Sequence, residues 1–325
     1  MIEQIMLTLF AIVVVGYIAG KLGYMGGTFD KRLSKVVIDI ACPALILSSA
    51  MTGTLPDRRY ILPLLLISAI TYILLTAVAL WLPRLLTKKK EDEGPIGFAL
   101  MFGNVGFMGY PIVASIFGHE AVFYAAVLNV VNTFVVFTIG TMLIVGKNQE
   151  PSEAEKEMSR KKMLRKVLYS TPMLSAYMTM LIVALEIKDI PAWVSQPLTM
   201  IGNITVPAAL LIIGSSMSQL PLRAMLGNRT VYATTLLRLA ILPLAIHFLF
   251  TAIGQFIPSE SQFSTLFSPF VVGINTVVIA MPVATYGTIL CLRHGKDTTL
   301  ITEVTFITTL LSMLTIPLLV TYILN

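Results

Sequence analysis

The sequence predicts an all-α integral membrane protein with ten transmembrane helices. Of the 325 residues, 56% are hydrophobic and only 12% are charged, and the mean hydropathy is +0.84. A soluble domain carries about 25% charged residues, so this chain has too few charges to cover a water-facing surface of its size. Ten apolar runs of roughly 20 residues, each long enough to cross a bilayer, account for most of its length.

The ten expected spans follow one another with short connections. In chain order they cover residues 4–21, 33–51, 60–84, 95–117, 120–146, 168–187, 194–217, 230–254, 264–290 and 300–324. The first has Glu3 before it and lacks a basic leader, so it is predicted to be a retained helix and not a signal peptide. Domain boundaries follow: a first five-helix unit at 1–146, a charged cytoplasmic linker at 147–167, and a second five-helix unit at 168–325.

The first span carries a stripe of small residues, Gly16, Gly20 and Gly23. Glycines at helical spacing let another helix approach closely. The stripe therefore predicts tight packing within the chain or at a dimer seam.

Lysine and arginine are distributed unevenly between the connections. The odd-numbered connections carry 19 of the 23 Lys and Arg residues, and the even-numbered ones carry three. Positive residues favour the cytoplasmic side of a membrane. The odd connections are therefore predicted to be cytoplasmic, with both termini on the non-cytoplasmic side of the cell (inner) membrane.

Two pairs of landmarks indicate an internal repeat. The second and seventh spans share a Pro-Ala pair within residues 42–47 and 206–211, 164 residues apart, and in each span a second proline, Pro56 or Pro221, follows. The fourth and ninth spans, at 103–111 and 274–282, each place an Asn seven residues before a Pro, with an offset of 171. Since five spans is an odd number, the second unit must enter the membrane from the opposite face. The pattern predicts two inverted five-helix repeats, an architecture of secondary transporters.

The paired Asn and Pro residues indicate a binding site. A proline in mid-span interrupts the helical hydrogen bonds, and the freed backbone groups must face protein or a water-filled cavity. Broken helices 4 and 9 crossing near the midplane would direct their half-helix N-termini at an anion such as a carboxylate. The alternative is that these prolines are ordinary kinks. The candidate substrate-binding residues are Asn104, Gly106, Tyr110, Pro111, Asn275, Thr276 and Pro282.

The motif Gly-Asn-Val-Gly-Phe-Met-Gly-Tyr-Pro at 103–111 resembles the fourth helix of the auxin efflux carrier family, and Asn275 to Pro282 resembles its ninth. The resemblance extends over the whole chain. It implies inverted repeats with crossing helices 4 and 9, export of organic anions such as indole-3-acetate or malate, and a homodimer. The central polar loop has only about twenty residues, shorter than in plant long-form members. That difference favours a prokaryotic member and argues against auxin itself as the substrate.

Ionisable residues inside spans are functional candidates. Asp39 lies one turn before Pro43, where burial would suit proton coupling, or where it simply pairs with a neighbour. Glu303 corresponds to Asn132 at the offset of 171, and both are candidates for coupling, although Glu303 equally fits the cytoplasmic end of its span. Arg238 is expected to anchor its span by reaching cytoplasmic water. His247 is expected to be a hydrogen-bonded structural residue.

Several function classes find no support in the sequence. Nucleotide-binding and hydrolase motifs are absent, and the two cysteines and three scattered histidines form no metal motif. No enzyme activity, metal, cofactor or nucleic-acid partner is expected. The predicted function is a secondary carrier whose partners are a small organic anion and the lipid bilayer. An anion-permeable channel and a substrate-sensing membrane protein of the same fold are the alternatives.

Overall fold

The computed structural model describes residues 2–51, 55–146, 165, 168–219, 228–258, 261 and 263–324. The regular structure of these residues is helical, apart from an isolated bridge between Gly103 and Val283. Each of the ten segments that hydropathy predicts contains helix, and those at 95–117 and 264–290 are interrupted. The predicted linker at 147–167 lies outside the described residues except for Arg165, and Pro221 of the proposed repeat lies outside them as well.

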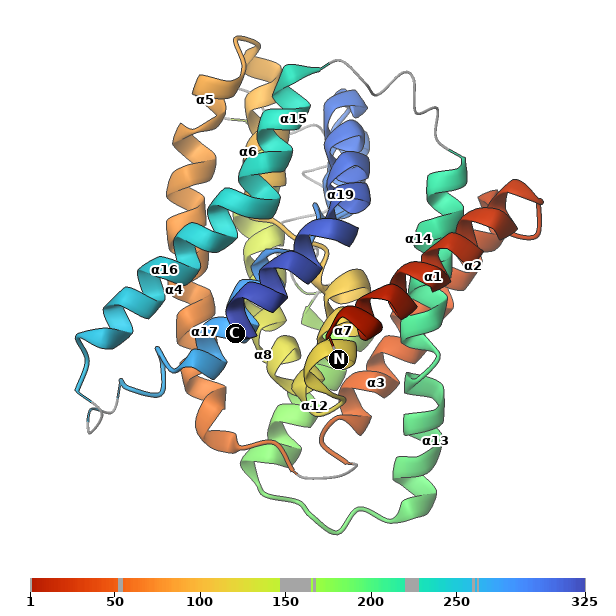
Figure 1. Ribbon diagram of the computed structural model, residues 1–325, viewed down its shortest axis with the longest axis vertical. Helices are drawn as coiled ribbons and strands as arrows, with labels where there is room; N and C mark the ends of the chain where they lie inside the picture. Colours follow the sequence, from red (N-terminus) through yellow and green to blue (C-terminus); the bar gives the residue numbers. More distant parts are fainter. Residues whose placement is uncertain are drawn as a thin grey trace.

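The helices of the first half follow in the order expected from the sequence (Figure 1). They are α1 (Ile2–Lys21), α2 (Gly27–Val36), the π-turn η1 (Val37–Ala41), α3 (Cys42–Ser48), the 3₁₀ turn η2 (Arg58–Tyr60), α4 (Ile61–Trp81), α5 (Pro83–Leu86), α6 (Lys90–Met101), the π-turn η3 (Val105–Gly109), α7 (Tyr110–Phe117), α8 (Ala121–Val135), the π-turn η4 (Val136–Gly140) and α9 (Thr141–Val145).

The helices of the second half begin after the linker. They are α12 (Thr171–Ala184), α13 (Ala192–Gly202), α14 (Thr205–Ser218), α15 (Arg229–Leu236), the π-turn η6 (Leu237–Ile241), α16 (Leu242–Gln255), α17 (Pro269–Ile279), α18 (Tyr286–Arg293) and α19 (Thr299–Leu324).

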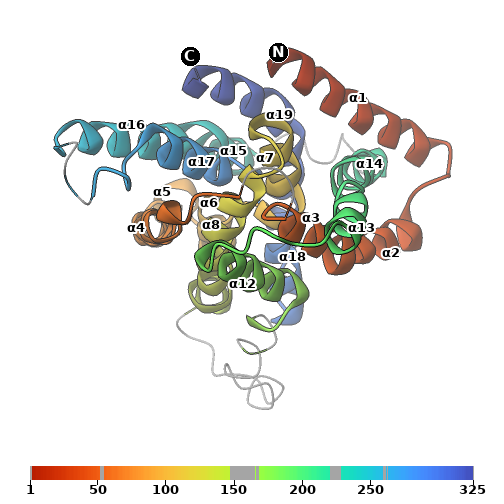
Figure 2. The ribbon, with the colours of Figure 1, turned by 90° about the horizontal axis from the view of Figure 1, so that it is seen from below.

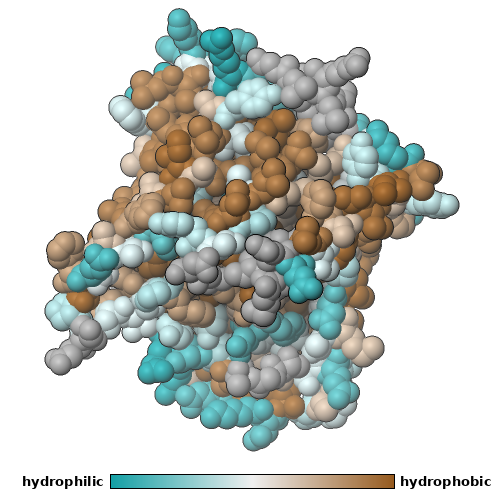
Figure 3. Space-filling model, in the orientation of Figure 1, coloured by the Kyte–Doolittle hydropathy of each residue, from teal (hydrophilic) through white to brown (hydrophobic). Residues whose placement is uncertain are grey.

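Length and composition make this a membrane protein. Among the described residues, five helical stretches are long and apolar enough to cross a bilayer: 58–86, 121–145, 192–218, 229–255 and 299–323. Large apolar side chains also face outward, including Ile73 at 69% and Leu318 at 71% exposed. Apolar side chains cover much of the face in Figure 3, whereas hydrophilic ones gather at its lower end. Such a surface is stable against lipid and not against water.

The helices form two groups around a central set. Seen from below, α1, α2 and α14 lie on one side, α4, α16 and α17 lie on the other, and α6, α7 and α8 lie between them (Figure 2). Phe98, Phe102 and Phe123 of the central set are fully enclosed. The middle of the bundle is therefore packed with side chains, and any site there is built from α6, α7, α8 and the helices that touch them.

Three of the π-turns stand at the same distance from a proline. η1, η3 and η6 end two residues before Pro43, Pro111 and Pro243. A proline supplies no N–H to the preceding turn, and a π-turn is the wider winding that often marks such a local irregularity. The prolines at 43 and 243 therefore widen their helices without ending them.

Helix α1 packs on α14 with almost no space between the two backbones. A Cβ added to Gly16 would overlap the carbonyl of Leu211, one added to Gly214 would overlap the carbonyl of Val13, and one added to Gly20 would overlap Ser218. The small-residue stripe thus serves packing within the chain, and a dimer seam is not needed to explain it. Gly23 lies apart, in a turn with φ of 80° and nothing close to it.

This contact predicts the effect of adding one methyl group. Gly16→Ala should lower the melting temperature of the detergent-solubilised protein by several degrees, because the Leu211 backbone has no room to move aside. Gly273→Ala is the matched control, since its new methyl would lie 3.5 Å from Ile323, an ordinary contact distance. Equal melting temperatures for the two variants would contradict the tight α1–α14 contact.

Candidate functional site

The fourth predicted span, 95–117, is broken at Gly103. This point lies eight residues before Pro111, which the sequence suggested as the breaking point. α6 ends at Met101, Asn104 has φ of −80° and ψ of 66°, and the chain becomes helical again from Val105. Pro111 sits in the first turn of α7, where the missing N–H has little consequence. The break is therefore made by the glycine and the residues beside it, while the proline adds the π-turn.

The ninth predicted span, 264–290, is also broken, and the two breaks face each other. The Asn104 N–H donates to the Pro282 carbonyl at 2.8 Å, and the Ala284 N–H donates to the Phe102 carbonyl at 3.1 Å. The two segments run antiparallel, with Gly103 opposite Val283. Backbone groups freed by each break are thus satisfied by the other, as an apolar surrounding requires. We call this pair of segments, 102–104 and 280–285, the crossing.

Arg238, in the eighth predicted span at 230–254, contacts one segment of the crossing and the helix end beside the other. It lies in η6 and is only 1% exposed. Its Nε donates to the Met281 carbonyl at 3.2 Å, and its Nη1 donates to the Leu100 carbonyl at 3.0 Å. A Cβ on Gly103 would overlap the guanidinium, so a side chain there would require Arg238 to move. The expectation that Arg238 reaches cytoplasmic water was wrong, because hydropathy gives the depth of a residue along its span but not the direction of its side chain.

The charge of Arg238 is balanced by helix ends and not by an acid. Among the described residues, no Asp or Glu forms an ion pair with it. The carbonyls that it binds stand at the C-terminal ends of α6 and α17. Each helix C-terminus carries about −0.5 of an elementary charge, so two of them offset roughly one guanidinium. The N-terminal ends that begin after the crossing keep their positive potential.

A chain of buried polar side chains lies behind the crossing. The Tyr72 hydroxyl donates to Asn132 Oδ1 at 2.6 Å, Asn132 Nδ2 donates to Asn129 Oδ1 at 2.8 Å, and Asn129 Nδ2 donates to the Tyr110 hydroxyl at 2.8 Å. Tyr72 also stacks on Phe102, with ring centroids 6.0 Å apart. These bonds connect α4, α8 and α7. Two predicted site residues, Tyr110 and Asn132, are therefore structural neighbours of the crossing.

The side of the crossing away from this chain is more open. The Asn104 side chain is partly exposed, and within the described part of the protein it makes no hydrogen bond. A Cβ on Gly106 would meet nothing within 4 Å. The N–H groups of Gly106 and Phe107, in the first turn, find no backbone acceptor in the described residues, as is usual at a helix N-terminus. Donors for an anion are thus available here.

Asn275 and Thr276 are engaged elsewhere. Asn275 is buried inside α17, where its Nδ2 donates to the Thr71 hydroxyl of α4 at 3.0 Å. The Thr276 hydroxyl donates to the Val272 carbonyl at 2.7 Å and lies 3.2 Å from His247 Nδ1. The structure does not bring the amides of Asn104 and Asn275 into equivalent positions. Gly103 and Val283, which face each other, are 180 residues apart, whereas the Asn-Pro motifs are 171 apart.

The three coupling candidates do not meet. Asp39 is exposed on η1, between the exposed side chains of Ile38 and Ile40, so the burial assumed for proton coupling was wrong. Glu303 is half-buried near the start of α19, and Asn132 bonds to Tyr72 and Asn129 instead.

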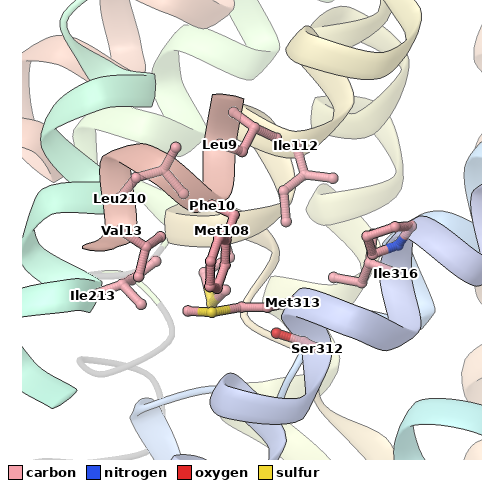
Figure 4. Close-up of a pocket in the computed structure, with 11 residues that line it drawn as sticks. Leu9, Phe10, Val13, Met108, Ile112, Leu210, Ile213, Ser312, Met313 and Ile316 are labelled. Carbon is pink, nitrogen blue, oxygen red and sulfur yellow. The ribbon is translucent and has the colours of Figure 1, made fainter. Parts of the chain in front are cut away.

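An apolar pocket of about 50 Å³ is lined in part by the helical segment that follows the break. Met108 and Ile112 extend toward it from η3 and α7, four and eight residues after Asn104. Figure 4 shows the side chains of α1, α14 and α19 converging on Met108. The remaining lining residues are Leu9, Phe10, Val13, Leu210, Ile213, Ser312, Met313, Ile316 and Pro317. A ligand in this pocket would touch carbon almost everywhere, with Ser312 supplying a hydroxyl.

Comparison with known proteins identifies the family. The model of the membrane transport protein family, that of the auxin efflux carriers, matches residues 1–320. The chain belongs to the auxin efflux carrier family. It is 24% identical over 319 residues to an uncharacterized transporter of Methanothermobacter thermautotrophicus, a match that covers 97% of this chain and 96% of the other. It is 25% identical over 224 residues to an uncharacterized transporter of Methanocaldococcus jannaschii, covering 66% and 68%.

Membership of the auxin efflux carrier family makes the chain a membrane transport protein and argues against an enzyme. Sequence reasoning missed three residues at the site of this carrier: Thr71, Tyr72 and Asn129. Each is a polar residue within an apolar run, and that signal was present in the sequence. It was not used because the partners of Thr71 and Tyr72 lie 204 and 60 residues away, and the Asn129–Tyr110 contact joins two different helices, so these bonds become visible only when the helices pack.

Removing Arg238 should destabilise this carrier. Arg238→Met would leave the Leu100 and Met281 carbonyls buried without donors, at a cost of roughly 1–3 kcal/mol for each. We expect a melting temperature several degrees below that of the unmodified protein, measured by tryptophan fluorescence in detergent. Arg229→Met, at an exposed position on α15, is the control. A melting temperature for Arg238→Met equal to that of this control would show that Arg238 does not hold the crossing.

The Asn275–Thr71 bond can be tested separately from substrate binding. Asn275→Ala, Thr71→Ala and the double variant form a cycle. Hydrogen bonds between membrane helices contribute about 0.6 kcal/mol on average and at most about 1.7, and we expect a coupling free energy in that range. Additive effects on unfolding in a mixed-micelle assay would contradict a direct bond.

Proposed function

We propose that this protein is a secondary transporter that exports organic anions by alternating access. The observation that carries the proposal is the crossing. The C-terminal ends of α6 and α17 share one buried guanidinium. The helix that begins after the break, at η3, starts beside the partly exposed Asn104 and has open space at Gly106. An anion is the ligand that such an N-terminal end favours. The amide of Asn104 would add a donor without the cost of a buried charge.

The position of Arg238 supports an anion over a cation. Because Arg238 occupies the carbonyls at the two C-terminal ends, those carbonyls are not available to a cation. The first-turn N–H groups at Gly106 and Phe107 remain and attract negative charge. A carboxylate bound there would accept hydrogen bonds from these groups and from Asn104.

The apolar pocket lined in part by η3 and α7 supports a particular kind of carboxylate. Its lining of Leu, Ile, Phe, Met and Val side chains stabilises an apolar body. A dicarboxylate such as malate would have to desolvate its second charge against this surface. An aromatic or aliphatic monocarboxylate, of which indole-3-acetate is a convenient probe, is therefore the preferred substrate class.

Alternating access would come from movement between the two groups of helices. The pocket lies between α1 and α14 on one side and α7 and α19 on the other. We propose that the halves at 1–146 and 168–325 are inverted repeats, and that one group rocks against the other around the crossing. In this proposal the protein lies in the cell membrane with both termini on the non-cytoplasmic side, since the positive connections would face the cytoplasm.

Transport currents test the proposal. Purified protein in liposomes on a solid-supported membrane would receive rapid concentration jumps of indole-3-acetate, malate, a neutral indole and an organic cation. A saturable current with indole-3-acetate, larger than with malate, is expected. A response only to the cation, or unitary currents that do not saturate, would refute an anion carrier.

Asn104 is the residue whose change should affect this current most specifically. Asn104→Ala should raise the half-saturating concentration of indole-3-acetate about tenfold, since a hydrogen bond to a charged group contributes roughly 1.5–3 kcal/mol. It should leave the melting temperature nearly unchanged, because the side chain makes no hydrogen bond within the described residues. The control is Asn203→Ala, an exposed position at the end of α13. Unchanged saturation in Asn104→Ala would remove this residue from the site.

A further inference from the structure

The apolar pocket has a buried floor and an exposed rim. The lining side chains from η3, α7 and α14 are buried, whereas Phe10 of α1 is exposed and Met313 and Pro317 of α19 are partly exposed. We call these three residues the rim. Figure 2 shows α1 and α19 at the outer edge of the bundle, with α7 behind them. The pocket therefore opens outward, between α1 and α19.

The rim lies at the depth of the hydrocarbon core of the membrane. Phe10 stands eleven residues before Lys21 at the end of α1, and Met313 stands fourteen residues after Thr299 at the start of α19. At 1.5 Å per residue they lie about 16 Å and about 21 Å from those helix ends, in a core about 30 Å thick. Leu314, beside Met313, is exposed as well. The rim therefore faces lipid chains.

The pocket itself offers no free hydrogen-bond donor. Among the described residues that line it, Ser312 has the only polar side chain, and its hydroxyl donates to the Thr309 carbonyl of the same helix at 2.8 Å. A carboxylate inside the pocket would lose its water without gaining a hydrogen bond, which is costly. An alkyl chain transferred there from water gains about fourfold in affinity for each methylene buried. The pocket thus suits a chain and not a charged group.

Donors for a carboxylate lie on the same helical segment as the floor of the pocket. The N–H groups of Gly106 and Phe107 have no backbone acceptor among the described residues. Met108 follows directly, donates its N–H to the Asn104 carbonyl at 3.0 Å, and lines the pocket. Ile112 also lines it, eight residues or about 12 Å along the helix after Asn104. The extended chain of decanoate has about this length, so one molecule reaches both places.

We infer that the pocket holds the alkyl chain of a fatty acid that enters from the bilayer between α1 and α19, with its carboxylate at the N–H groups of Gly106 and Phe107. The inference rests on the proposed anion transport and narrows its substrate class to aliphatic acids that partition into lipid. The flexible side chains of Met108 and Met313 can adapt to chains of different shape. The competing occupant is an acyl chain of a phospholipid, which has no free carboxylate.

Binding of straight-chain acids to the full chain in nanodiscs tests the inference. Butyrate, hexanoate, octanoate, decanoate and decanol would compete with tritiated decanoate, and empty nanodiscs would measure partition into lipid. We expect the affinity to rise about fourfold per methylene from butyrate to octanoate. Decanol should compete at least about tenfold more weakly than decanoate, because it lacks the charge that strengthens hydrogen bonds. Equal competition by decanol would indicate a phospholipid chain and overturn the inference.

Two variants at the rim locate the chain. Phe10→Ala and Met313→Ala should each weaken decanoate binding about fivefold, because each removes apolar surface from the rim. They should leave butyrate binding and the melting temperature nearly unchanged. Phe134→Ala and Met142→Ala, at exposed positions outside the pocket, are matched controls. If the rim variants bind decanoate as their controls do, the chain does not lie in this pocket and the inference is wrong.

Quenching by brominated lipids tests the route of entry. Met313→Trp would be made in a chain that carries Trp81→Phe and Trp193→Phe, so that one tryptophan remains. We expect phospholipids brominated in mid-chain to quench it and decanoate to relieve part of the quenching. Leu314→Trp, exposed on α19 and outside the pocket, should be quenched without this relief. No quenching at position 313, or equal relief at both positions, would overturn entry from the bilayer.

Failure of this inference and failure of the proposed function give different results. If indole-3-acetate drives a saturable current while straight-chain acids of every length bind alike, the anion carrier stands and the fatty acid is wrong. If indole-3-acetate drives no current and no straight-chain acid binds, both are wrong.

Discussion

The structure depends on how two interrupted helices satisfy their backbone groups inside an apolar surrounding. Each interruption frees N–H and C=O groups that lipid cannot bind. The Asn104 N–H and the Phe102 carbonyl are satisfied by the opposite segment, and the Leu100 and Met281 carbonyls are satisfied by Arg238. Because these partners are fixed, η6 lies against the crossing, and the absence of a side chain at Gly103 leaves room for the Arg238 guanidinium. The N–H groups of Gly106 and Phe107, in the first turn after the break, then have no backbone acceptor among the described residues.

This arrangement treats the negative and the positive helix ends at the crossing differently. The negative ends of α6 and α17 are neutralised within the protein, so they do not repel an anionic ligand. The positive end after the break is left for solvent or substrate. The buried chain from Tyr72 to Tyr110 keeps α4, α8 and α7 in register behind it. In the proposed function, binding would therefore take place on one side of the crossing, while the structural hydrogen bonds lie on the other.

The positions of the helical segments were predictable from the sequence because hydropathy is a local property. In the span at 95–117 the sequence placed the break at Pro111, whereas the structure has it at Gly103. Pro111 lies near the start of α7, where a proline is tolerated, and Gly103 is the residue against which the Arg238 guanidinium packs. The role of Arg238 was missed because it depends on the direction of a side chain. Asn104 and Asn275 do not pair because Asn104 follows the break, while Asn275 lies inside α17 and bonds to Thr71.

The π-turns before Pro43, Pro111 and Pro243 have a consequence for the evolution of these helices. A π-turn holds one residue more than the α-helical turn it replaces. Deleting that residue would restore a regular turn and leave the side chains beyond it on the same face, whereas a deletion in a regular turn of the same span would swing everything beyond it by about 100°, the angle of one residue in an α-helix. Each π-turn is therefore a place where the span can lose its extra residue without changing which face of the following helix looks inward.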